Sequence, residues 1–134
     1  MSGEQGGTVY ATALYDAAEQ AGRLKDVNRD LAGFVRTLAE NPDLARVLFN
    51  PAFPAERKRL ILQKVTAGSD VLLTNALLVL LENGRLDVLV DLERSFADRY
   101  GREQRELAVT LTTAVAIDDA TADGLRDRLA QATG

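Results

Sequence analysis

Apolar residues recur every three or four positions through most of the first hundred residues, and this spacing predicts helices. The strongest pattern lies in residues 24–38, where the apolar side chains share one face and most charged side chains lie off it. That face consists of Leu24, Val27, Leu31, Phe34, Val35 and Leu38. An alanine-rich stripe over residues 10–21 predicts an earlier helix, with Thr8 as its cap and Gly22 as its stop.

Turn-forming residues divide the next part of the chain into two shorter helices. Asn41 and Pro42 predict the start of a short helix, with Asn41 as its cap and Pro42 at its first position. After a break at Pro51 and Pro54, residues 55–65 form the next predicted helix. Each of these segments has an apolar face, so both are expected to pack against a common core.

Two further helices complete a predicted six-helix bundle. Asp70 is placed to cap a fifth helix that ends near Asn83 and Gly84, and a sixth covers residues 85–100. The fifth helix is apolar on nearly every side, a property typical of a helix that is buried all round. We therefore expect it either at the centre of the bundle or with one apolar strip exposed to a partner.

The character of the sequence changes after Gly101. A polar stretch at residues 102–106 is typical of a linker, and the alternation in residues 107–116, rich in valine and threonine, predicts a strand. Asp118 then predicts the cap of a final helix, whose apolar positions are Ala122, Leu125, Leu129 and Ala132. A single strand is not stable alone, so the chain is expected to be cut short inside a second domain and to carry a flexible tail in dilute solution.

The predicted fold class is therefore an all-α six-helix bundle followed by a fragment of an α/β domain. Residues 1–7 are expected to form a disordered tail, and residues 8–101 the partner-binding helical domain. Residues 102–106 are the linker, and residues 107–134 an incomplete C-terminal domain.

Composition argues against an enzyme. The chain of 134 residues contains no cysteine and no histidine, so it lacks a thiolate nucleophile, the usual acid/base at neutral pH and the commonest metal ligands. The adjacent carboxylates Asp118 and Asp119 are better explained as helix-capping residues than as a catalytic pair. We predict no catalytic residues, no cofactor and no metal.

Charge gives no sign of a nucleic-acid site. The net charge is -4, and the one basic cluster, Arg57, Lys58, Arg59 and Lys64, is interpreted as a solvated helix face rather than a phosphate site. The longest apolar run, residues 71–81, is shorter than the roughly 20 residues that span a bilayer. We expect a soluble chain that does not insert into a membrane itself.

Several segments together resemble one family. Residues 10–18 read Tyr-Ala-x-Ala-Leu-Tyr-Asp-Ala-Ala, and residues 75–86 read Asn-Ala-Leu-Leu-x-Leu-Leu-Glu-Asn-Gly-Arg-Leu. The Asn-Pro pairs at residues 41–42 and 50–51, and the position of Lys58, also fit. In these respects the chain resembles the delta subunit of a rotary ATP synthase, also called the oligomycin-sensitivity-conferring protein.

This resemblance implies a peripheral-stalk (stator) subunit without catalytic activity. Its helical domain would bind the amphipathic N-terminal helix of an alpha subunit, and its C-terminal domain, incomplete here, would bind the b subunits of the stalk. In a bacterium it would be peripheral to the plasma membrane, on the cytoplasmic side. The first and fifth helices carry more apolar surface than a six-helix bundle needs to bury, so we place the partner there. The predicted contact residues are Tyr10, Ala13, Leu14, Ala17, Ala76, Val79, Leu80 and Asn83.

Two alternatives remain open at the level of sequence. The chain could be a helical adaptor that binds a different amphipathic helix, or a non-catalytic fragment of a larger enzyme.

Overall fold

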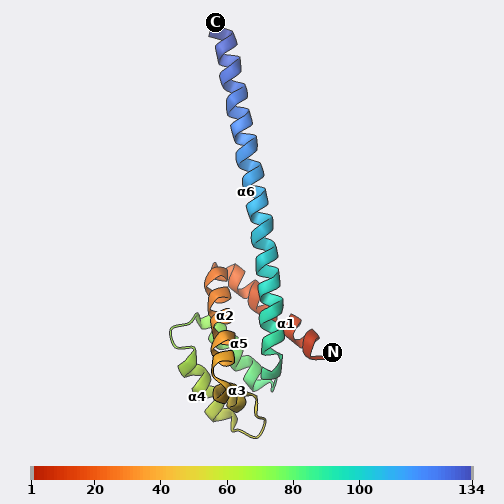
Figure 1. Cartoon of the computed structure of the whole chain (residues 1–134), viewed down its shortest axis with the longest axis vertical. Helices are drawn as coiled ribbons and strands as arrows, with labels where there is room; N and C mark the ends of the chain where they lie inside the picture. The colour runs from red at the N-terminus through yellow and green to blue at the C-terminus, as the bar shows by residue number, and fades with distance from the viewer. Residues whose placement is uncertain (1, 134) are drawn as a thin grey trace. The chain divides into compact units, whose positions relative to one another are not determined.

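The chain folds into helices, drawn in Figure 1 from red at the N-terminus to blue at the C-terminus. The computed structural model describes the backbone of residues 2–133 and the side chains of residues 6–118 and 121. Its elements are α1 (Ser2–Ala21), α2 (Leu24–Glu40), α3 (Pro42–Phe49), α4 (Ala55–Val65), α5 (Val71–Glu82), the 3-10 helix η1 (Leu86–Val88) and α6 (Leu89–Thr133). The described residues include no strand, and the predicted all-α helical bundle is confirmed.

Contacts divide the chain into two compact units, Met1–Arg99 and Tyr100–Gly134. The core lies in the first unit, because every buried apolar side chain among the described residues falls between Ala11 and Phe96. From α2 it receives Val27, Leu31, Phe34 and Leu38, all at most 6% exposed. These residues belong to the apolar face that the sequence predicted for this helix.

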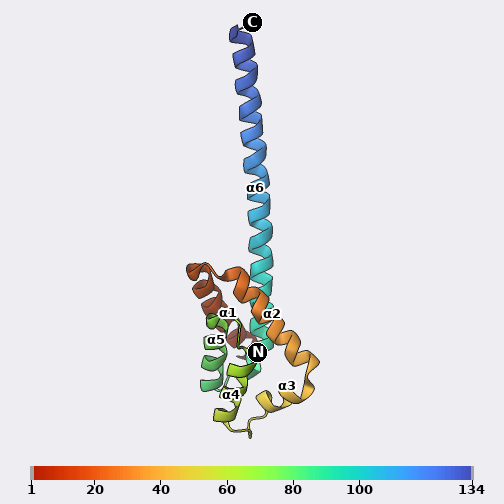
Figure 2. The same ribbon diagram turned by 90° about the vertical axis from the view of Figure 1, so that its left-hand side faces the viewer.

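α5 lies at the centre of the first unit. It contacts α1, α2, α4 and η1, and Figure 2 shows α1 running beside it. Leu73, Leu77 and Leu80 are at most 1% exposed, whereas Val79 remains 45% exposed. The sequence left open whether this helix is central or exposes an apolar strip, and the structure shows that it does both.

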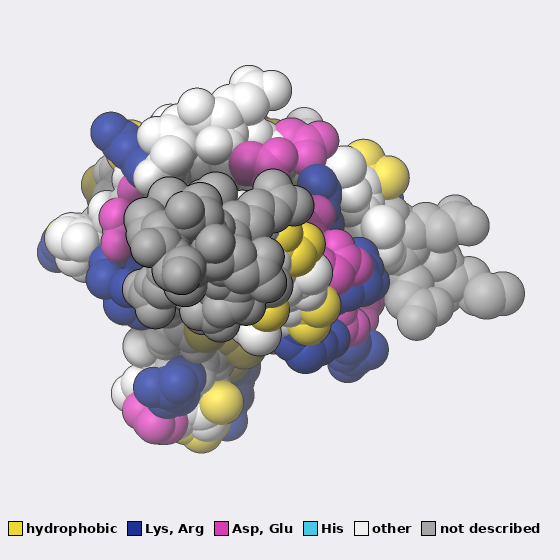
Figure 3. Space-filling view, turned by 90° about the horizontal axis from the view of Figure 1, so that it is seen from above, with side chains coloured by type: hydrophobic (Ala, Val, Ile, Leu, Met, Phe, Trp, Pro, Cys, Tyr) yellow, Lys and Arg dark blue, Asp and Glu magenta, His cyan; other side chains and the backbone are white. Residues whose placement is uncertain are grey.

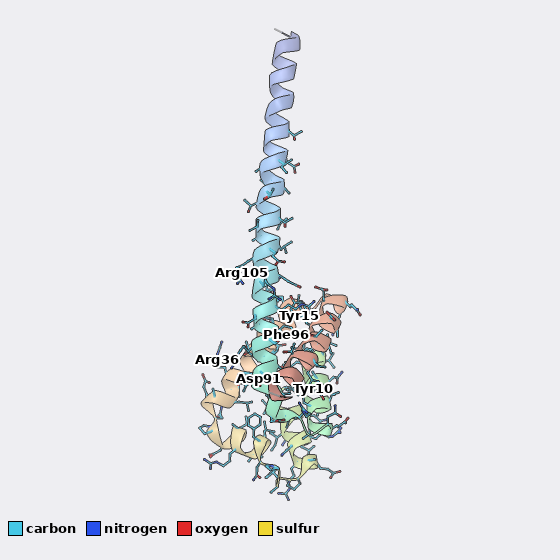
Figure 4. All side chains as sticks on the ribbon, turned by 90° about the vertical axis from the view of Figure 1, so that its right-hand side faces the viewer. Tyr10, Tyr15, Arg36, Asp91, Phe96 and Arg105 are labelled. Carbon is cyan, nitrogen blue, oxygen red and sulfur yellow. The ribbon has the colours of Figure 1, made fainter. Side chains whose placement is uncertain are left out.

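An aromatic pair joins α1 to the first turns of α6, as Figure 4 shows. The rings of Tyr15 and Phe96 have centroids 5.0 Å apart and are tilted by 55°. The guanidinium of Arg99 lies 3.9 Å from the centre of the Tyr15 ring and forms a 3.2 Å ion pair with Asp16. Tyr15 is fully buried, so it is a core residue and is not available as a partner contact.

The helix ends follow the sequence signals in part. Asp70 caps α5 as predicted, because its Oδ1 accepts a 2.9 Å hydrogen bond from the backbone N–H of Leu72. Gly84 has a φ of 65° just after α5, a conformation that glycine adopts without strain. The predicted capping by Asn41 is wrong: its side chain makes no cap hydrogen bond to α3 and instead donates to the carbonyl oxygen of Thr37 at 2.8 Å.

The N-terminal segment differs from its prediction. α1 begins at Ser2, six residues before the predicted start at Thr8, so residues 2–7 are helical where a disordered tail was expected. Gly7 is buried, and a Cβ atom added there would lie 2.6 Å from the Cβ of Asp91. The lack of a side chain at Gly7 thus permits a close approach of α1 to α6, which a polar, glycine-rich sequence does not reveal.

The predicted strand over residues 107–116 is wrong, because these residues lie inside α6. A helix satisfies its backbone N–H and C=O groups internally, whereas a strand needs a neighbouring strand. Thr110 also finds a partner within the helix, since its hydroxyl donates a 2.9 Å hydrogen bond to the carbonyl oxygen of Glu106. The valine and threonine content favoured a strand, but no second strand lies in the described residues.

α6 also includes the two segments that flank the predicted strand. Residues 102–106, predicted as a linker, are helical, and no new helix begins at Asp118. The apolar positions predicted for the last helix, Ala122, Leu125, Leu129 and Ala132, lie outside the residues whose side chains the structure describes.

Candidate functional site

An apolar groove runs between α1 and α5. It encloses about 240 Å³. Nine residues line it: Tyr10, Ala13, Leu14 and Ala17 from α1, Leu72, Asn75, Ala76 and Val79 from α5, and Leu92 from α6. None of these side chains is charged, and the two that carry a polar group are Tyr10 and Asn75.

α1 and α5 contribute lining residues to the groove at the same spacing. On α1 the lining residues stand at intervals of three, one and three, and the set on α5 repeats these intervals. Residues at i, i+3, i+4 and i+7 share one face of a helix, so each helix turns one continuous stripe toward the groove. The small side chains of Ala13, Ala17 and Ala76 leave the space between the stripes open. Leu92, 1% exposed, forms part of the buried floor.

The structure brings together six of the eight predicted contact residues, namely Tyr10, Ala13, Leu14, Ala17, Ala76 and Val79. Leu80 does not line the groove, because it is fully buried in the core. Asn83 lies outside the lining set, but its Nδ2 donates a 3.0 Å hydrogen bond to the phenolic oxygen of Tyr10. It therefore acts on the groove through Tyr10.

Sequence reasoning missed three lining residues: Leu72, Asn75 and Leu92. The first two could have been found, because they lie one helical turn before Ala76 and Val79 on the same face of α5. Leu92 carried no such signal. It reaches the groove from a third helix, and only the packing of α6 against the other two places it there.

Charged side chains pair outside the groove. Arg59 of α4 forms a 2.7 Å ion pair with Glu82, which lies at the C-terminal end of α5. On the face seen in Figure 3, Lys and Arg side chains lie among Asp and Glu side chains rather than in one basic patch. The lining of the groove itself carries no charged side chain.

The basic cluster predicted on α4 is only partly solvated. Arg57, Arg59 and Lys64 are exposed, but Lys58 is only 8% exposed, so the interpretation of all four as a solvated face is wrong for this residue.

Among the described residues no group of three or more acidic side chains is placed to hold a metal ion. Within the same residues, no helix is long and apolar enough to cross a membrane.

Comparison with known proteins identifies the family. A family model described as ATP synthase delta (OSCP) subunit matches residues 7–134. A protein of Rubrobacter xylanophilus named ATP synthase subunit delta is 31% identical over 127 residues, which cover 95% of this chain and 71% of that protein. One of the same name from Rhodopseudomonas palustris is 33% identical over 127 residues, covering 93% of this chain and 68% of that protein.

A solved structure shares the fold. A chain in the cryo-EM structure of Polytomella F-ATP synthase matches with a TM-score of 0.63 and 20% identity, over 69% of this chain and 82% of that chain. At this identity the likeness concerns the fold alone. The helical bundle, the family model and the bacterial relatives agree, and the chain belongs to the ATP synthase delta (OSCP) subunit family. The resemblance inferred from the sequence is confirmed.

Proposed function

We propose that this chain is a non-catalytic stator subunit of an F-type ATP synthase, and that its α1/α5 groove binds the N-terminal helix of an alpha subunit. The observation that carries the proposal is the groove itself, with two matched apolar stripes and no charged lining residue. Family membership supplies the assembly in which such a groove would act.

The geometry suits an amphipathic helix as the partner. Such a helix presents apolar side chains at i, i+3, i+4 and i+7, the same spacing that the two walls show. Ala13, Ala17 and Ala76 allow a partner helix to approach closely, and Val79, 45% exposed in the free domain, provides apolar contact area. Burial of these side chains against the partner would slow dissociation, because the apolar area must return to water when the complex separates.

The proposed role is mechanical. The bundle holds the catalytic head through the alpha helix, and a C-terminal domain holds the b subunits of the stalk. The joint resists the torque of the rotor without any chemical step, so the role requires no cofactor. In a bacterium the subunit lies peripheral to the plasma membrane on its cytoplasmic side.

Titration with a synthetic peptide of the alpha subunit's N-terminal helix tests the groove. Ala13→Asp places a carboxylate in the groove, where the bound peptide would bury it without a partner. This should weaken binding by about 3 kcal/mol, or roughly a hundredfold in Kd. Because Ala13 is exposed in the free domain, the helical signal of the variant in circular dichroism should be unchanged.

Ala97→Asp is the matched control, because Ala97 is an exposed alanine inside a helix and does not line the groove. It should bind the peptide as the unmodified protein does. Equal affinity of the Ala13→Asp variant would remove the groove from the binding site. If the unmodified protein shows no affinity for the alpha peptide, the chain is better explained as an adaptor for another amphipathic helix.

A further inference from the structure

A second pocket lies on the first unit, and it shares no lining residue with the α1/α5 groove. It encloses about 670 Å³ between the loop that joins α3 to α4 and the end of α5. Its walls are mainly apolar and include Phe49, Phe53, Leu81 and Leu86, but Lys58 also lines it. The pocket therefore combines apolar surface with one cation that α4 turns inward.

Lys58 has no partner in the described part of the chain. It is 8% exposed, yet its ammonium forms no hydrogen bond and no ion pair with any described residue. The other buried polar residue, Thr66, is satisfied by a 2.6 Å hydrogen bond to the carbonyl oxygen of Leu62. The ammonium nitrogen is not among the fully buried polar atoms of the described residues, so it reaches the water in the pocket and can pair with a ligand there.

The nearest groups of the described residues leave the Lys58 ammonium unpaired. The carbonyl groups at the end of α5 already accept backbone hydrogen bonds, that of Leu80 from Arg85 at 2.8 Å and that of Leu81 from Gly84 at 3.1 Å. Asp87 also lines the pocket, but it is exposed and forms no ion pair with Lys58. A cation in the first turn of α4 is also disfavoured by the helix dipole.

The surroundings favour an anion. The N-terminus of α4 borders the pocket through Pro54 and Ala55, and Pro54 provides no side-chain cap for it. Helix N-termini attract negative charge, and Glu56 already stands in the first turn of α4, so Lys58 is the feature that favours an added carboxylate.

The loop beside the pocket is ordered by its own hydrogen bonds. Asn50 accepts one from the N–H of Ala52 at 3.0 Å on its side chain, and one from the N–H of Phe53 at 3.1 Å on its carbonyl group. A wall held in this way needs little further ordering when a ligand binds.

We propose that this pocket binds an acidic, apolar peptide segment of a partner protein, with a carboxylate of the segment paired to Lys58 and a bulky apolar side chain against Phe53 and Leu86. Charge complementarity selects this occupant: a purely apolar segment would leave the ammonium buried and unpaired. The proposal concerns a surface separate from the α1/α5 groove and does not depend on the function assigned to that groove.

Two blocked tripeptides test the proposal on the full chain by NMR titration. Acetyl-Leu-Glu-Phe-amide should shift the amide signals of Lys58, Phe53 and Gly84 and leave those of Ala13 and Ala76 unchanged. Acetyl-Leu-Gln-Phe-amide, which lacks the charge, should bind about tenfold more weakly, because hydrogen bonds to charged groups are the stronger ones. Equal binding of the two peptides, or shifts confined to Ala13 and Ala76, would overturn the proposal.

Three variants test whether Lys58 is the group that pairs with the carboxylate of the peptide. Lys58→Met should lose the preference for the glutamate peptide, because it removes the charge that pairs with the carboxylate. Lys64→Gln removes a charge from an exposed position of the same helix and should leave the preference intact. Asp87→Asn should strengthen binding, since it removes a competing carboxylate from the pocket.

The remaining outcomes are equally decisive. An unchanged peptide preference in the Lys58→Met variant would exclude Lys58 as the binding group. Sodium acetate at the same concentration is the last control. If acetate shifts the same signals as strongly as the glutamate peptide does, the pocket binds free carboxylates and the peptide proposal is wrong.

Discussion

The side-chain amide of Asn83 donates a 3.0 Å hydrogen bond to the phenolic oxygen of Tyr10, although the two residues are 73 positions apart in the chain. The bond joins the C-terminal end of α5 to α1. Because the Tyr10 ring lines the groove, this bond holds one wall of the groove in place. The contact is exposed, so we expect its effect mainly on the shape of the groove and less on the stability of the fold.

Tyr10→Phe should weaken binding of the alpha peptide about threefold to tenfold, because the freed ring must lose rotational freedom when the partner binds. The free energy of unfolding should fall by no more than about 1 kcal/mol. Asn83→Ala removes the donor and should have a similar effect. In a double-mutant cycle the two changes should not add, since each removes the same bond. Fully additive losses in the titration would show that the bond does not position the ring.

A pair of glycine substitutions should change stability in opposite directions. Gly7→Ala should destabilise the protein by about 1–3 kcal/mol, because the added Cβ would lie 2.6 Å from that of Asp91. Gly33→Ala should stabilise it by about 0.5–1 kcal/mol, since Gly33 lies inside α2 and an added Cβ meets no atom within 4 Å. Urea denaturation measures both. A neutral Gly7→Ala would favour the disordered tail that the sequence predicted over the helical start of α1.

A hydrogen bond between α2 and the start of α5 should make a measurable contribution to the free energy of unfolding. Oδ2 of Asp30 accepts a 2.8 Å bond from the partly buried backbone N–H of Asp70. Asp30→Ala should cost about 1–3 kcal/mol of unfolding free energy, because this N–H loses its partner. Asp30→Asn keeps an acceptor oxygen and should cost less. Asp26→Ala, which removes an exposed ion pair to Arg29, is the control and should change stability by less than about 0.5 kcal/mol in the same denaturation experiment.

Removal of residues 106–134 should leave the bundle folded. The buried apolar side chains of the described residues all lie between Ala11 and Phe96, so the shortened chain retains that core. We expect the thermal midpoint to change by less than about 4 °C, which corresponds to under roughly 1 kcal/mol for a domain of this size. The alpha peptide should bind it with unchanged affinity. A chain that loses cooperative unfolding on shortening would show that the second unit contributes to the core.

The sequence predicted the helices well where two independent signals agreed. In α2 the apolar period and the following Asn41-Pro42 break indicate the same segment, and the structure places it at Leu24–Glu40. At α5 the Asp70 cap and the Asn83-Gly84 stop bound the helix to within one residue of its observed limits. At the N-terminus the signals did not agree. A polar, glycine-rich segment has no apolar period, and its helical state depends on the contact of Gly7 with α6.

The lining of the groove could likewise be predicted only on the helix whose pattern of apolar residues marks one face. On α1 the alanine-rich stripe pointed to Tyr10, Ala13, Leu14 and Ala17, which line the groove, because this helix is amphipathic and its open face can be read from the period. On α5 the period carries no such information, since the helix is apolar on nearly every side. The sequence could not tell that Leu80 points into the core while Leu72 lines the groove.

What the sequence by itself determined is the family, the six helical segments and one wall of the groove, because these depend on local patterns and on motifs of adjacent residues. Only the tertiary structure decided three other features: the orientation of α5, the burial of Lys58 and the helical state of residues 107–116. The physical reason is the same for all three. Each depends on which groups lie nearby in space: the neighbours of α5, the pocket around Lys58 and, in the described part of the chain, the absence of a strand that could pair with residues 107–116.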